Sequence, residues 1–179
     1  MFVKSLMIIG CLCLTSIAQA KTVDQSVMNK LMDHESLSVL LKSKPEATRR
    51  ELICLALNAY HEARSSTLLD QIATTFVAKN RYENQYRGKN ICEVVWYWRQ
   101  FSWTHDGKSD YPKEKKAWAN AQRIAFMVYF NDHFGLDDPT NGKMHYVRKD
   151  IVRKLKWTRT AKHKQLIGAH VYLIPVGFK

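Results

Sequence analysis

The sequence predicts an α+β fold that is predominantly helical, with a small β element near the C-terminus. Three stretches, 52–62, 69–80 and 118–128, place their apolar residues three or four positions apart, which is the spacing of one helix face. Residues 170–174 are rich in β-branched and aromatic side chains, which favours a strand. Helices therefore account for most of the expected structure.

The first twenty residues have the features of a secretory signal. Lys4 gives a positive start, an apolar run follows, and Ala18 and Ala20 provide a small-residue cleavage site. We expect an exported protein that is periplasmic or extracellular after cleavage near Ala20. No later stretch reaches the roughly 18 apolar residues that a spanning helix requires, so we expect no mature membrane anchor.

Size and charge limit the domain count and the partners. Removal of residues 1–20 leaves about 160 residues, which is enough for one core. The formal net charge of the chain is +12, and the signal contributes a single lysine to it. A surface this basic favours polyanions. For an exported protein these are the anionic cell envelope and its peptidoglycan, whereas nucleic acid fits the charge but not the compartment. We expect a monomer.

Two cysteines remain after cleavage, and they leave two possibilities open. Cys54 and Cys92 form a candidate disulfide in an oxidising compartment, or they are two buried free thiols. The histidines show no metal-ligand spacing, and the zinc-protease pattern that His61 and Glu62 begin fails because residue 65 is Ser. The sequence therefore predicts no metal and no cofactor.

The first helices follow the signal. Residues 21–45 form an N-terminal helical extension, which is amphipathic over 21–42. Two capping patterns then compete to start the next helix, one at Ser43 with Pro45 and one at Thr48. Either start leads into a helix that ends near Glu62 and Arg64.

Glu62 ends the apolar stripe of this helix. Leu52, Leu55, Ala59 and Glu62 share one face, so Glu62 points where the leucines point. Burial raises the pKa of a carboxylic acid, and a raised pKa suits a general acid near neutral pH. The alternative interpretation is a last-turn glutamate that is exposed to solvent.

A second polar residue ends the next stripe. Leu69, Ala73, Phe76 and Asn80 repeat the helical spacing, and a buried amide needs hydrogen-bond partners. Asn80 is therefore a candidate site residue or a helix cap.

An aromatic and polar cluster follows the charged loop 82–90. A short helical stripe over Ile91–Trp98 leads into residues 96–106, which read WYWRQFSWTHD and end in the turn residue Gly107. Rings beside amide, hydroxyl and carboxyl groups are typical of sugar-binding sites. Core packing is the competing interpretation for each ring alone.

The remaining elements are a long helix and two strands. Residues 113–130 form the longest helical pattern, and dense turn chemistry follows at 137–142. We expect short strands at 144–147 and 170–174. Residues 148–164 between them are basic and predict a solvated face that contacts the envelope.

An ordered set of motifs between Leu52 and Leu173 resembles the SleB-type cell-wall hydrolases, which include the spore-cortex-lytic enzymes. In order, the motifs are Tyr60-His61-Glu62-Ala63-Arg64, Val77-Ala78-Lys79-Asn80-Arg81, Ile91-Cys92-Glu93-Val94-Val95, Gln100-Phe101-Ser102-Trp103, Asp106-Gly107, Ala117-Trp118, Asp138-Pro139-Thr140, His145-Tyr146 and Ile167-Gly168-Ala169-His170-Val171. The order and spacing carry the resemblance more than any single motif.

The resemblance implies that residues 46–179 form a catalytic domain related to lysozyme-like and lytic transglycosylase folds. It implies cleavage of the β-1,4 bond between N-acetylmuramic acid and N-acetylglucosamine, with Glu62 as the catalytic acid. The sequence departs from the family at Ser65 and Ser66, where Gly-Glu is common, and at Asn141 and Lys143. These departures concern loop shape and substrate preference.

The predicted mechanism has Glu62 protonate the glycosidic oxygen and then, once ionised, act as a base. Asp106 and Asp138 are the candidates for a second acid, but both lie in turns, so we favour a lytic transglycosylase over a hydrolytic muramidase. An amidase and a non-catalytic cationic envelope-binding module are the rival functions. The residues expected to contact substrate are Asn80, Gln100, Phe101, Ser102, Trp103 and Tyr146.

Overall fold

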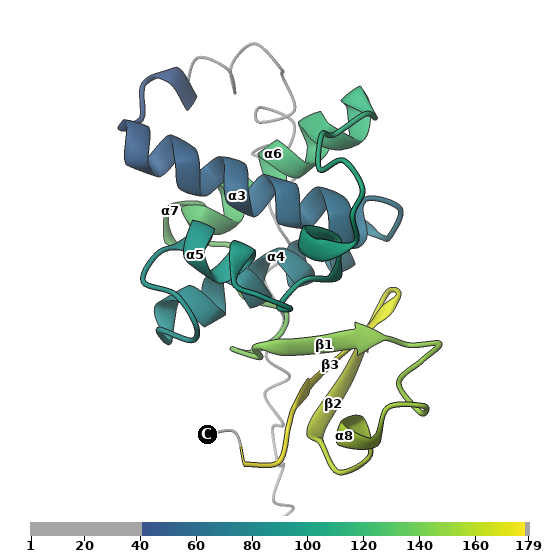
Figure 1. The fold of residues 1–179 in the computed structure, drawn as a ribbon. Helices are drawn as coiled ribbons and strands as arrows, with labels where there is room; N and C mark the ends of the chain where they lie inside the picture. The colour runs from purple at the N-terminus through teal and green to yellow at the C-terminus, as the bar shows by residue number, and fades with distance from the viewer. Residues whose placement is uncertain (1–40, 178–179) are drawn as a thin grey trace, which may run out of the picture.

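The structure, a computed structural model, describes residues 41–177, and the predicted signal peptide and most of the predicted N-terminal helical extension lie outside these residues. The helices form one layer, and a small sheet lies against one side of it (Figure 1). The helices are α3 (Glu46–Ala63), α4 (Leu68–Glu83), α5 (Ile91–Trp96), α6 (Lys115–Tyr129), α7 (Asn131–Phe134) and α8 (Lys156–Arg159), with a 3-10 turn η1 (Ser102–His105). The predicted α+β class, mostly helical, is confirmed.

The sheet has three antiparallel strands. They are β1 (His145–Arg148), β2 (Lys162–Ile167) and β3 (His170–Ile174), in the spatial order β1-β3-β2. The sequence patterns indicated β1 and β3 but missed β2. This strand lies at an edge, its first residues are basic and exposed, and a register shift between Lys162 and Gln165 interrupts its pairing. Lysines on an edge strand interrupt the alternation of apolar and polar residues by which strands are recognised in a sequence.

The main core lies among α3, α4, α5 and α6. Leu55, Phe76, Ile124 and Met127 are at most 2% exposed there, because the apolar stripes of these helices face one another. The disulfide between Cys54 of α3 and Cys92 of α5 crosses this core. A second, smaller cluster joins α4 to the sheet through Val77 and Tyr172.

Helix boundaries follow local chemistry. α3 begins at Glu46 directly after Pro45, so the earlier of the two predicted starts is used. Thr67 caps α4, since its side chain accepts a hydrogen bond from the backbone N–H of Asp70. The helical stripe was predicted to reach Trp98, but α5 ends at Trp96 and Trp98 lies in the following loop.

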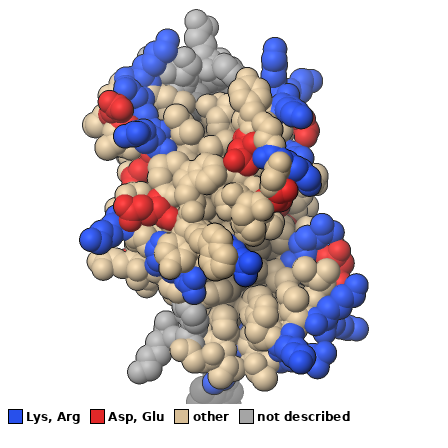
Figure 2. All heavy atoms as spheres, viewed as in Figure 1, with Lys and Arg blue, Asp and Glu red and all other residues tan. Residues whose placement is uncertain are grey.

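Basic side chains gather over the segment between β1 and β2 (Figure 2). In residues 148–164, eight lysines and arginines are exposed and Asp150 is the one acid. Among the described helices, none combines the length and the apolar character that a bilayer crossing requires.

Candidate active site

Glu62 lies in the last turn of α3, on the wall of a hollow of about 510 Å³ between the helices and the sheet. The helical wall consists of residues 62–63 and the link 65–67 to α4. The opposite wall consists of residues 148–150 at the end of β1 and residues 168–170 at the β2–β3 turn. The hollow therefore forms where segments from both ends of the domain meet.

The Glu62 side chain is partly buried, as its place on the apolar stripe predicted. Burial raises the pKa of its carboxyl group above the ordinary value of 4.5. A hydrogen-bonding interaction with Tyr146 and the positive charges of His170 and Arg81 lower the pKa, but they do not cancel the effect of burial. Glu62 therefore keeps its proton to a higher pH than an exposed glutamate does.

The Tyr146 hydroxyl is the neighbour that distinguishes this site. It is buried, and among the described residues it has no hydrogen-bond partner at full bonding geometry. Burial raises its pKa well above 10, so the hydroxyl stays protonated and is a donor. It has a hydrogen-bonding interaction with the Glu62 carboxyl group.

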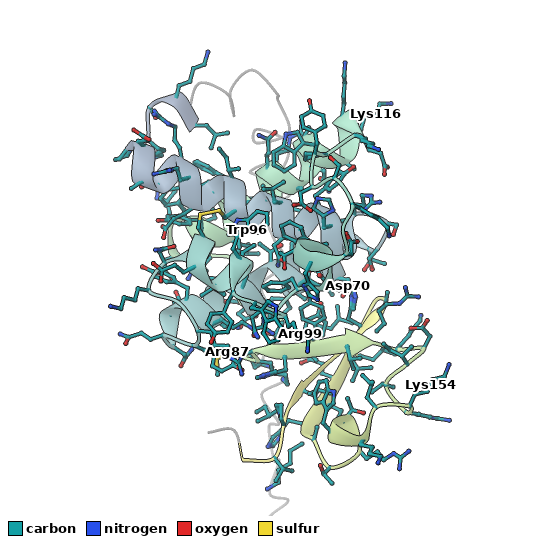
Figure 3. All side chains as sticks on the ribbon, in the orientation of Figure 1. Asp70, Arg87, Trp96, Arg99, Lys116 and Lys154 are labelled. Carbon is teal, nitrogen blue, oxygen red and sulfur yellow. A yellow bond between two sulfur atoms is a disulfide. The ribbon has the colours of Figure 1, made fainter. Side chains whose placement is uncertain are left out.

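Asp70 lies beneath the hollow and is fully buried. Its carboxylate accepts hydrogen bonds from the Ser66 hydroxyl, the Ala169 N–H at 2.9 Å, His170 Nδ1 at 3.0 Å and the Tyr172 hydroxyl at 2.7 Å. Burial acts to raise the pKa of Asp70, but these four donors outweigh it and the pKa is lowered. Figure 3 shows Asp70 at the boundary between the helices and the sheet.

Gly168 allows Asp70 to reach the β2–β3 turn. Its φ is +56°, and a Cβ atom there would lie 2.6 Å from the Asp70 Cβ. Only glycine fits both the left-handed backbone and the close approach. The turn then presents the Ala169 N–H and the His170 ring to Asp70, and His170 to the hollow.

Asn80 lies in a different polar cluster. Its amide nitrogen donates to Asp138 Oδ2 at 2.8 Å, to Thr140 Oγ1 at 3.2 Å and to the Lys143 carbonyl at 3.2 Å. It is not the C-cap of α4, which is Asn84. Asn80 thus ties α4 to the turn before β1, and it does not line the Glu62 hollow.

The predicted aromatic walls lie away from this hollow. Phe101 and Trp103 are both buried, the first against the Arg81 guanidinium at 4.8 Å and the second stacked on the His61 ring at 4.6 Å. Ser102 is exposed and lines a separate hollow with Trp103 and His61. Gln100 is half-buried in the loop before η1. Of the predicted substrate contacts, the structure brings only Tyr146 next to Glu62.

The carboxylates proposed as a second acid are not in the Glu62 hollow. Asp138 binds Asn80, Thr140 and the Gly142 N–H, and Asp106 lines the hollow around Ser102. Asp150 lines the Glu62 hollow instead, where Arg148 holds it at 2.8 Å. The sequence reasoning did not assign Asp150 a role.

Asp70, His170 and Arg81 were also missed. The motif Ile167–Val171 marked the His170 turn, and the spacing of Ser66 and Asp70 is typical of a capped first helical turn, but neither pattern links residues so far apart in the chain. Within residues 41–177 no group of three or more potential ligands is placed to hold a metal ion.

Comparison with known proteins identifies a family over most of the described residues. A family model described as Cell Wall Hydrolase matches residues 65–173, a match that begins directly after the helix turn carrying Glu62 and includes Asp70, Tyr146 and His170. No curated protein and no solved structure matches the chain.

Proposed function

The chain belongs to the cell wall hydrolase family, and we propose that it is a SleB-type enzyme that cleaves the glycan strands of peptidoglycan. The bond would be the β-1,4 linkage between N-acetylmuramic acid and N-acetylglucosamine, with Glu62 as general acid. The observation that carries the proposal is the Glu62 carboxyl group, whose pKa is raised by burial, on the wall of a hollow. A carboxylic acid with a raised pKa beside a substrate-sized space is the arrangement that glycoside cleavage uses.

In the first step, Glu62 gives its proton to the glycosidic oxygen. The bond from muramic acid C1 to that oxygen breaks, and positive charge develops at C1 and the ring oxygen. The leaving N-acetylglucosamine hydroxyl carries the proton away, and Glu62 becomes a carboxylate. Electrostatic interactions with His170 and Arg81 favour this ionised form, because they lower the pKa of Glu62.

In the second step, the muramic acid C6 hydroxyl attacks C1. Glu62 accepts the hydroxyl proton, which regenerates the acid and leaves a 1,6-anhydro sugar without consuming water. Two observations support this lytic transglycosylase route. Besides Glu62, Asp150 is the one carboxylate among the described residues that line the hollow, and it is paired with Arg148. Asp70 beneath it has four donors already.

Hydrolysis is the second candidate, and the position of Asp150 favours it. If Asp150 were to leave Arg148 and hold a water molecule, attack by that water on C1 would give a reducing end instead of an anhydro ring. Asp150 and Glu62 line the same hollow, so this alternative needs no carboxylate from elsewhere.

The setting of the enzyme belongs to the same proposal. The N-terminal pattern supports export to the periplasm or the exterior, and a formal charge of +12 supports association with the anionic envelope. We propose that the mature protein acts as a monomer on glycan strands, without a cofactor and without nucleic acid as a partner.

The test is digestion of purified sacculi by the parent enzyme and by Glu62→Gln, with mass spectrometry of the soluble products. We expect 1,6-anhydromuramoyl ends from the parent and a rate about 1,000-fold lower for the variant. Asp150→Asn is the matched control, since it removes the other carboxylate of the hollow and should change neither product nor rate by much.

Other outcomes would revise the proposal. Reducing ends that disappear with Asp150→Asn would establish the hydrolytic route. Release of intact stem peptides would indicate an amidase. Full activity of Glu62→Gln would remove Glu62 from the mechanism, and sacculi that bind the parent without being cut would indicate a non-catalytic binding module.

A further inference from the structure

We propose that five residues, Tyr86, Arg87, Tyr97, Trp98 and Arg99, form a second binding site for peptidoglycan, next to the proposed catalytic hollow. We call these residues the aromatic–arginine surface. Its rings would contact the sugars of a glycan strand, and its guanidinium groups would bind the carboxylates of the stem peptides. The identity of the polymer rests on the proposed function.

The surface combines exposed rings with arginines that lie over them. Trp98 is 68% exposed and Tyr97 is 44% exposed. The Arg99 guanidinium carbon lies 4.1 Å from the centre of the Trp98 ring, and that of Arg87 lies 5.2 Å from the Tyr97 ring and 5.1 Å from the Tyr86 ring. Exposed tryptophan and tyrosine next to arginine is the composition of binding surfaces and not of a core.

Both arginines are among the five described non-glycine residues with a positive φ. Arg87 has a φ of +65° and Arg99 a φ of +58°, which is the left-handed region that glycine adopts without strain. Non-glycine residues in this region carry a conformational cost and concentrate at functional sites. At both positions glycine would relieve the strain, so an arginine-to-glycine change can remove the side chain without a backbone cost.

The surface is linked to the catalytic hollow by Arg81 and by β1. The guanidinium carbon of the buried Arg81 lies 6.0 Å from the centre of the Tyr86 ring, and Arg81 also interacts electrostatically with Glu62 and Tyr146. Tyr86 contacts His145, the first residue of β1, at 5.7 Å between ring centres. Arg148, the last residue of β1, lines the hollow.

The length of β1 therefore separates the two sites. Four residues of strand span roughly 10 to 13 Å. Arg87 and Arg99 both lie on the helical side of β1 in Figure 3, along the same boundary as Asp70. A polymer that follows this boundary would contact the surface and the hollow at once.

The chemistry of the surface favours a glycan with peptides attached. Ring faces match the C–H faces of pyranoses, and a guanidinium group can bind a carboxylate with two parallel hydrogen bonds. A bare polyanion would use the arginines but not the rings, whereas a neutral glycan would use the rings but not the arginines. Stem-peptide-bearing peptidoglycan uses both.

The test measures the binding of full-length protein to purified sacculi by sedimentation. Every protein carries Glu62→Gln, so that the polymer stays intact during the measurement. We expect Trp98→Ala to weaken binding about fivefold, from the loss of one ring contact. Arg99→Gly should weaken it by a similar factor and leave the melting temperature equal or higher, because glycine relieves the positive φ.

Lys116→Ala is the charge-matched control. Lys116 is exposed near the start of α6, at the far end of the helical layer from Arg87 and Arg99 (Figure 3). It removes one positive charge, as Arg99→Gly does, and should leave binding unchanged. Equal losses for Lys116→Ala and Arg99→Gly would show that total charge alone matters and would overturn the site.

A second probe separates the two kinds of contact. On glycan strands whose stem peptides have been removed, the effect of Trp98→Ala should persist and the effect of Arg99→Gly should disappear. Unchanged binding of Trp98→Ala to both polymers would overturn the proposal. A lytic Glu62→Gln protein would instead overturn the catalytic assignment, so the two failures are distinguishable.

Discussion

Glu62 and Asp70 are two acids on successive helices at the same helix–sheet boundary, and they have opposite electrostatics. Asp70 is the more buried, yet its pKa is lowered, because four donors surround its two oxygens. Burial raises the pKa of Glu62, and the hydrogen-bonding interaction with Tyr146 lowers it by less. The number of donors at each carboxyl group therefore contributes to which acid keeps its proton.

In the proposed function, the difference separates a structural acid, Asp70, from a reactive one, Glu62. Asp70 is fixed as an anion and holds together α4, the β2–β3 turn and β3. The pKa of Glu62 is raised by burial, which is the direction that the proposed general acid chemistry requires. The four predictions below test this division, from the largest expected effect to the smallest.

Asp70→Asn should destabilise the fold strongly. The amide keeps the shape but places an NH₂ group among four donors, so at least one buried donor loses its acceptor. We expect the free energy of unfolding in urea to fall by about 3 kcal/mol. Asp137→Asn, at an exposed position, should change it by less than about 0.5 kcal/mol. A loss under about 1 kcal/mol for Asp70→Asn would contradict a structural role for this anion.

Gly168→Ala should disrupt the same cluster from the other side. The new Cβ would lie 2.6 Å from the Asp70 Cβ, and the backbone would be strained at a φ of +56°. We expect a loss of about 2 to 3 kcal/mol in unfolding free energy. Gly135→Ala is the matched control, since its φ is +58° and nothing lies within 4 Å of the added Cβ. Its cost should be about 1 kcal/mol. Equal losses of unfolding free energy for Gly168→Ala and Gly135→Ala would mean that the close approach to Asp70 does not contribute to the destabilisation.

The two acids should give pH effects of opposite sign. The pKa of Glu62 is raised, so the lytic rate should fall about tenfold per pH unit once the pH exceeds that pKa, as the acid loses its proton. The pKa of Asp70 is lowered, so its stabilisation is present above the ordinary value of 3.8 and is lost as the pH falls towards its folded-state pKa.

Initial rates of sacculus clearance and urea midpoints, both measured across pH, test these signs. Asp150→Asn should not change the pH above which the lytic rate begins to fall. A lytic rate that rises steadily with pH would assign Glu62 the role of a base in the slow step.

Tyr146→Phe should have the smallest effect. The hydroxyl lowers the pKa of Glu62, so its removal should move the high-pH limb of activity upwards by less than about one unit. Stability should change little, because this buried hydroxyl has no partner at full bonding geometry among the described residues. Tyr172→Phe makes the same chemical change on β3 but removes a 2.7 Å hydrogen bond to Asp70. It should cost about 1 to 2 kcal/mol. If the fall in activity instead began at a lower pH in Tyr146→Phe, the hydrogen-bonding interaction of Tyr146 with Glu62 would be contradicted.

Local patterns predicted the helices and the position of Glu62 well. The stripe that ends in Glu62 is buried over Leu52, Leu55 and Ala59, since helical periodicity needs only short-range information. The aromatic cluster was predicted less well. Phe101 and Trp103 lie in the core, and Tyr97 and Trp98 are exposed, because a loop has no period from which the direction of a side chain can be derived.

By itself, the sequence determined the helical layer, the two strands with clear patterns and the acid at the end of α3. Only the tertiary structure decided the surroundings of that acid. It brought Tyr146 and His170 from the C-terminal sheet to Glu62, and it placed Asp70 in its cluster of donors. The physical reason is that a pKa depends on neighbours in space, and these neighbours are supplied by strands about a hundred residues away along the chain.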